Sequence, residues 1–76
     1  MRVIYRVYDY GSETFHTREF MSSMAEVLEC ISQMMRDDVD FSNMVVEACL
    51  KDANGHVTYL SSTPVEMLYF ITEHEL

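Results

Sequence analysis

The stretch of sequence that decides the fold is SMAEVLECISQMMR, residues 23–36. Its apolar side chains recur at the i, i+3, i+4, i+7 spacing of one face of an α-helix. The residues in this series are Met24, Val27, Leu28, Ile31, Met34 and Met35. Ser23 and Glu26 match a capping box, in which the hydroxyl accepts from a first-turn amide and the carboxylate reaches back to the cap. The stretch therefore predicts an amphipathic helix over residues 24–36.

Two consecutive acidic residues mark the end of this predicted helix. Asp37 and Asp38 would place negative charge at the helix C-terminus, which the helix dipole disfavours. Residues 37–43 then form a polar connection with Phe41 as its apolar anchor.

Before the helix, β-branched and aromatic residues predict a hairpin. Residues 2–10 alternate with period two, so that one side carries Val3, Tyr5 and Val7 and the other carries Arg2, Arg6 and Tyr8. We expect Gly11 and Ser12 to form a tight turn with positive φ. Residues 13–18 would be the returning strand, with Phe15 and Thr17 facing the core.

After the helix, a second hairpin is predicted. Residues 44–51 alternate again between apolar and polar positions. Residues 52–55 form a connection in which Asn54 and Gly55 can take left-handed conformations. Residues 56–60 would return antiparallel to the first strand of this hairpin.

The C-terminal segment repeats the signal for a helix start. Thr63 and Glu66 match a second capping box, with Pro64 at the first helical position. Residues 67–71 are apolar on every side, so their periodicity fits either a helix or a buried strand. The capping pattern favours a helix over residues 64–73.

These elements predict an α+β protein of a single domain, residues 1–76, with the order ββαββα. Two hairpins would form a small single-layer antiparallel sheet, accompanied by a central amphipathic helix and a C-terminal helix. A core of this size stabilises the fold by only ~3–5 kcal/mol, so we expect a second subunit or a partner to reinforce it.

The composition narrows the class of partner. Thirteen acidic residues face five basic ones, which gives a net charge of −8. Direct nucleic-acid binding is not expected, because it needs a surplus of Lys and Arg facing the phosphates. No apolar run is long enough for a membrane span, and residues 1–6 do not form a signal peptide. We therefore expect a cytoplasmic protein whose two cysteines, Cys30 and Cys49, stay reduced.

The sequence contains no pattern typical of catalysis or metal binding. Neither cysteine has a histidine close to it in the sequence that could activate it. Cys49 and His56 are spaced unlike zinc ligands, and a calcium loop starting at Asp38 would need a glycine where Asn43 stands. We expect no enzyme, no cofactor and no metal site.

Charge placement and the apolar C-terminal segment together predict a binding surface. Residues 1–20 have no net charge, so residues 21–76 carry the entire −8. An acidic rim would form if the helices cover one face of the sheet, and Tyr69 and Phe70 would present an apolar anchor beside it. The candidate partner-binding residues are Glu26, Glu29, Asp37, Asp38, Asp40, Tyr69 and Phe70.

Three hypotheses for function follow from these features. In size, acidity and methionine content the chain resembles small accessory proteins of phages and mobile elements, which implies an inhibitor. It would occlude a basic, nucleic-acid-handling protein, in the extreme form as a nucleic-acid mimic whose carboxylates replace phosphates. The alternative is a structural or regulatory homodimer that uses the C-terminal apolar helix as its interface. A small metal binder or enzyme is the third.

Overall fold

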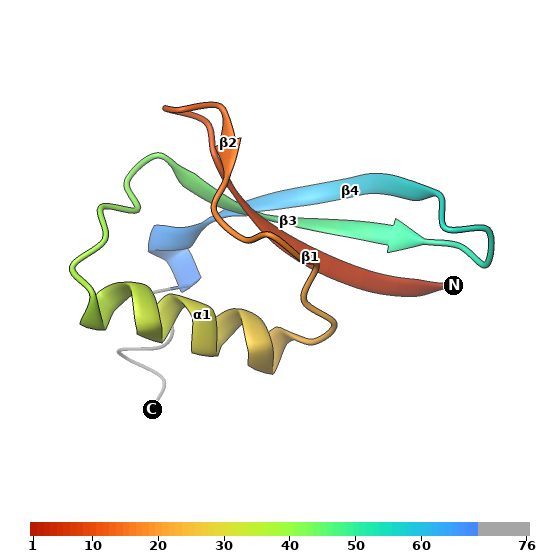
Figure 1. Ribbon diagram of the computed structural model, residues 1–76, viewed down its shortest axis with the longest axis horizontal. Helices are drawn as coiled ribbons and strands as arrows, with labels where there is room; N and C mark the ends of the chain where they lie inside the picture. Colours follow the sequence, from red (N-terminus) through yellow and green to blue (C-terminus); the bar gives the residue numbers. More distant parts are fainter. Residues whose placement is uncertain (69–76) are drawn as a thin grey trace.

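The computed structural model describes residues 1–68, which fold into a four-stranded antiparallel sheet with a helix packed against it (Figure 1). Residues 65–68 are helical, so the predicted order ββαββα and the α+β class are confirmed. The strands and the main helix are β1 (Arg2–Asp9), β2 (Thr14–Phe15), α1 (Met24–Arg36), β3 (Met44–Lys51) and β4 (Val57–Pro64).

The sheet has the strand order β2-β1-β3-β4, so β1 and β3 are its central pair. Their pairing runs without a shift from Arg2 opposite Lys51 to Asp9 opposite Met44. The chain crosses from β2 to β3 through α1, which covers one face of the sheet in Figure 1. β4 forms an outer edge, and its pairing with β3 shifts so that Leu60 has no partner on β3.

The hydrophobic core lies between α1 and the sheet face that it covers. Helical spacing aligns the buried residues of α1 on one side, as the sequence predicts. The buried members of this core are Val7, Val27, Ile31, Met34, Met44, Val46 and Val65. Val7 and Val46 are cross-strand partners, which places their side chains on the same face of the sheet.

The sheet face away from α1 is called the open face below. Side chains alternate along a strand, so every second residue of β1, β3 and β4 lies on the face opposite the core. The register assigns to the open face Arg2, Ile4, Arg6 and Tyr8 of β1, Phe15 of β2, Val45, Glu47, Cys49 and Lys51 of β3, and Val57, Tyr59, Ser62 and Pro64 of β4.

The first hairpin differs from its prediction in its turn. Glu13 has the positive φ, 59°, while Gly11 does not. Position 11 is instead crowded: an added Cβ would lie 2.9 Å from Nδ2 of Asn43, so this exposed side chain would have to shift. The carboxylate of Asp9 fixes the turn by accepting from the backbone N–H groups of Gly11 and Ser12.

The returning strand is also shorter than predicted, because a side chain replaces a backbone partner. β2 contains two residues, and beyond it Val7 N–H donates to the Thr17 hydroxyl at 3.2 Å. The chain rejoins the edge of β1 at Met21, which exchanges two backbone hydrogen bonds with Tyr5. Phe15 lies opposite Tyr8 on the open face, so its predicted inward orientation toward the core is wrong.

The second hairpin follows its prediction more closely. Gly55 has a φ of 83°, and Asp52 Oδ1 accepts from the N–H groups of Asn54 and His56. The return strand, however, continues to Pro64, and helical structure starts at residue 65. Thr63 therefore pairs with Val46 in the sheet and is not the helix cap that the sequence predicts.

Both ends of α1 are capped. Ser23 Oγ accepts from Glu26 N–H at 3.2 Å, as predicted. At the other end the Val39 N–H donates to the carbonyl of Met34, and the Asp38 N–H donates to the carbonyl of Met35. Asp38 has a φ of 53°. This is a Schellman motif. The helix thus ends through a left-handed residue, a different reason from the charge effect that the sequence suggested.

Candidate interaction surfaces

The acidic side chains of α1 point away from the core because the apolar ones point toward it. Glu26 and Glu29 are both exposed, on the side of α1 opposite the core residues. Ala25, Glu26, Glu29, Cys30 and Gln33 line an open hollow of about 570 Å³ on this surface. The sequence between positions 22 and 43 contains five acidic residues and one basic residue, Arg36, which gives a local charge of −4.

Two carboxylates of this surface are held by local contacts. Glu26 accepts from the backbone N–H of Ser22 at 3.0 Å and from its hydroxyl at 3.1 Å. This orients the carboxylate at the start of α1, where it also complements the helix dipole. Glu29 lies 3.7 Å from Arg36 Nη2, an exposed pair whose contribution to stability is small.

The remaining acids lie at the C-terminal end of α1 and in the loop behind it. Asp37 accepts from Gln33 Nε2 through both oxygens. Asp40 Oδ1 accepts from the backbone N–H and the hydroxyl of Ser42. These two hydrogen bonds, the backbone one first, lower the pKa of Asp40 below its usual range. The carboxylates of Asp37 and Asp40 are therefore fixed in direction by neighbouring donors.

The structure places all five described candidates on the exposed side of α1 and its loop. From Glu26 to Asp37 the helix rises by roughly 16 Å, so these residues form a strip and do not converge on one point. Arg36 interrupts the strip near its C-terminal end. Tyr69 and Phe70, the predicted apolar anchor, lie outside the described residues.

The two cysteines lie on opposite sides of the sheet and are both free. Cys30 belongs to α1 and packs at the margin of the core, whereas Cys49 is buried on the open face. Burial raises the pKa of each thiol, so both favour the protonated form that is a poor nucleophile. Within residues 1–68 no three His, Cys, Asp or Glu side chains are grouped to hold a metal ion.

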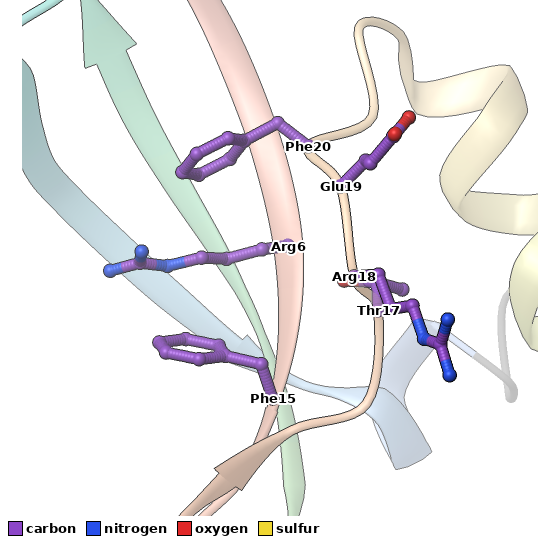
Figure 2. A pocket seen from close by; sticks show the side chains of 6 residues that line it. All are labelled: Arg6, Phe15, Thr17, Arg18, Glu19 and Phe20. Carbon is purple, nitrogen blue, oxygen red and sulfur yellow. The ribbon is translucent and has the colours of Figure 1, made fainter.

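A second surface, which the sequence reasoning missed, lies on the open face. The guanidinium of Arg6 lies between two phenylalanine rings, 4.4 Å from the centroid of Phe15 and 5.3 Å from that of Phe20 (Figure 2). Its Nε also donates to Glu47 Oε1 at 2.7 Å. Arg6, Phe15, Thr17, Arg18, Glu19 and Phe20 line a groove of about 310 Å³.

This arrangement of Arg6 depends on contacts distant in the sequence. Phe15 comes from β2, Phe20 from the segment behind it and Glu47 from β3, so only the sheet register brings them to Arg6. In the sequence, this surface is indicated only by the alternation that places Arg2, Arg6 and Tyr8 on one side of residues 2–10.

Comparison with known proteins finds no family model, no curated protein and no solved structure that matches the chain. Among the described residues no helix is both long and apolar enough to cross a membrane.

Proposed function

We propose that the protein is a non-enzymatic binding protein that occludes a basic surface of a nucleic-acid-handling protein. The observation that carries the proposal is the local charge of −4 on the exposed side of α1 and its loop. A strip of carboxylates attracts Lys and Arg side chains and raises the rate of association with a basic protein. In the form of a nucleic-acid mimic, these carboxylates would take the positions of phosphates.

The local hydrogen bonds of the carboxylates support this role. Glu26, Asp37 and Asp40 are each held by a neighbouring donor, so binding would order fewer side chains than on a flexible acidic surface. One oxygen of Asp40 has no hydrogen bond within the described part of the chain and can accept from a partner's cation.

The experiment replaces carboxylates by amides at the C-terminal end of the strip. The triple variant Asp37→Asn, Asp38→Asn, Asp40→Asn keeps one acceptor oxygen at each position, so the local hydrogen bonds and the fold should persist. The partner is first captured from lysate, purified and measured by stopped-flow association at low salt. We expect association about tenfold slower for the triple variant, and wild-type binding that weakens steeply as salt rises.

The matched control removes negative charge elsewhere. Glu13→Gln with Glu19→Gln changes two exposed acids near β2 and removes two negative charges, against three in the triple variant. An equal rate loss in this control would show that total charge and not the strip drives association. Association that is indifferent to salt would refute the proposal outright.

A second candidate function is that of a structural or regulatory homodimer, and the edge strand β4 favours it. β4 contains no charged residue, and Val57, Tyr59 and Leu60 are 40–54% exposed. An outer edge without charges can pair with the same strand of a second copy. Light scattering tests this candidate: Leu60→Lys should turn a dimer into a monomer, whereas Phe70→Asp should do so only if the C-terminal segment is the interface.

A further inference from the structure

The open face gathers most of the positive charge of an acidic protein. Three of the five basic residues of the chain lie on it, Arg2, Arg6 and Lys51. Among the strand residues of this face Glu47 is the single acid, and it is paired with Arg6. Arg2 and Lys51 therefore leave an excess of two positive charges on the face.

The positions of these two cations do not favour the fold. Arg2 and Lys51 are direct cross-strand partners at one end of the central β1–β3 pair. Like charges directly opposite each other destabilise a sheet, and neither residue has an ion pair or hydrogen bond with another side chain in the described chain. A bound anion would remove this repulsion, so the pair fits an anionic ligand.

The same face exposes aromatic rings on both sides of an apolar centre. Phe15, Phe20 and Tyr59 are 49%, 39% and 54% exposed. Between them Ile4 and Cys49 are 2% and 0% exposed, although α1 packs on the opposite face. The buried pair Ile4 and Cys49 therefore lies at the centre of the face, between the rings.

The ring of Tyr59 and the cation of Lys51 are close enough to contact one ligand. Tyr59 is opposite Cys49, two residues from Lys51 along β3, which corresponds to about 7 Å. At the other side of the face Arg6 lies between the rings of Phe15 and Phe20, and Figure 2 shows all three side chains extending to the same side of β1. The face therefore offers stacking surfaces and cations side by side.

We propose that the open face binds single-stranded nucleic acid, with bases stacking on Tyr59 and on the phenylalanine rings and phosphates contacting Arg2 and Lys51. Single-stranded DNA or RNA binds to exposed rings interleaved with basic side chains. Each base can stack on a ring, and each nucleotide carries a phosphate that a cation can contact. A duplex hides its bases, and an acidic peptide would use the cations but leave the rings without partners.

The net charge of −8 argues against direct nucleic-acid binding. It lowers the affinity of the whole protein for a nucleic acid, but it does not set the local charge at the open face. The acidic strip lies beyond α1, and a helix is about 10–12 Å thick. At physiological salt the Debye length is about 8 Å, so the strip is largely screened from the open face. The two cations of the face act at contact distance.

The test measures the fluorescence anisotropy of labelled single strands of about twelve nucleotides, DNA and RNA, titrated with the protein. With two phosphate contacts, the plot of log affinity against log salt should have a slope of about −1.4. A duplex of the same length and a poly-glutamate peptide are the competitors. Displacement by poly-glutamate as effective as by unlabelled strand would overturn the proposal in favour of an acidic protein partner.

Matched variants locate the site. Tyr59→Leu removes a ring but keeps bulk and should weaken binding about tenfold, while Tyr59→Trp should restore or strengthen it. Leu60→Ala, half exposed on the same strand, should have no effect. Lys51→Gln and Arg2→Gln should each lower the affinity, whereas Arg36→Gln, with the same change of charge on α1, should not.

All the altered side chains except Lys51 are exposed, so each variant should keep the fold. Circular dichroism checks this. The proposal is overturned if no strand binds at low salt. It is equally overturned if Arg36→Gln weakens binding as much as Lys51→Gln, or if Tyr59→Leu binds like the wild type.

Discussion

Asp38 gives the sharpest test of how the central helix ends. It occupies the left-handed position of the Schellman motif, with a φ of 53°. Glycine adopts this conformation without strain, whereas an L-residue pays roughly 1 kcal/mol or more there, with Asp near the low end. The carboxylate also lies at the negative end of the helix dipole, which costs a further ~0.3–1 kcal/mol.

Asp38→Gly should therefore stabilise the protein. Relief of strain and removal of the charge together exceed the roughly 0.4–1 kcal/mol that the greater freedom of glycine adds to the unfolded chain. We expect a net gain of about 1 kcal/mol in the free energy of unfolding. For a domain of this size the midpoint of thermal unfolding should rise by about 4–8 °C.

Two further variants separate the two causes. Asp38→Asn removes the charge and keeps a side chain that tolerates the left-handed region, so it should gain about half as much, and less at high salt. Asp38→Ala removes the charge, but alanine is strained in the left-handed region. Its free energy of unfolding should therefore be lower than that of Asp38→Asn. Thermal and urea unfolding followed by circular dichroism give the order. A glycine variant no more stable than the wild type would refute the assignment of the helix end.

Three other changes test separate contacts. Ser23→Ala removes the hydroxyl that accepts from Glu26 N–H and should lower the free energy of unfolding by about 1 kcal/mol in urea titrations, with Ser23→Asp as the control that retains a cap. The pKa of Asp40 is lowered by Ser42, so its stabilising effect is present above the ordinary value of 3.8 and is lost as the pH falls through the lower folded-state value; Asp40→Asn should lose stability less steeply in acid unfolding. Burial raises the pKa of Cys49 and covers its thiol, so in a Cys30→Ser background a thiol reagent near neutral pH should modify Cys49 only as fast as the protein unfolds; rapid labelling of this folded variant would contradict the position of Cys49.

The candidate interaction residues were predictable to unequal degrees. Glu26 and Glu29 were found because helical periodicity alone separates the exposed side of α1 from its core side. The stack of Arg6 between Phe15 and Phe20 was missed, since its three residues belong to three segments that meet only in the folded sheet. The alternation along residues 13–18 predicts that Phe15 faces the core, but the register with Tyr8 places it on the open face.

By itself the sequence determined the elements whose signals are local. The spacing of Val27 and Ile31, the cap at Ser23 and the turn at Gly55 each depend on residues within one or two turns of chain, and each appears in the structure as predicted. Local signals act through the backbone geometry of a few neighbouring residues, so they can be read without knowing the fold.

Only the tertiary structure decided which side chains share a surface. Pairing between segments far apart in the chain determines three features of the sheet. It leaves Leu60 unpaired, keeps β2 short and places Arg2 opposite Lys51. In a sheet a shift of one residue moves every side chain to the other face, so the composition of the open face could not be known before the register. The net charge of −8 is a sum over the sequence, but its separation into an acidic helix side and a basic, aromatic sheet face is a property of the fold.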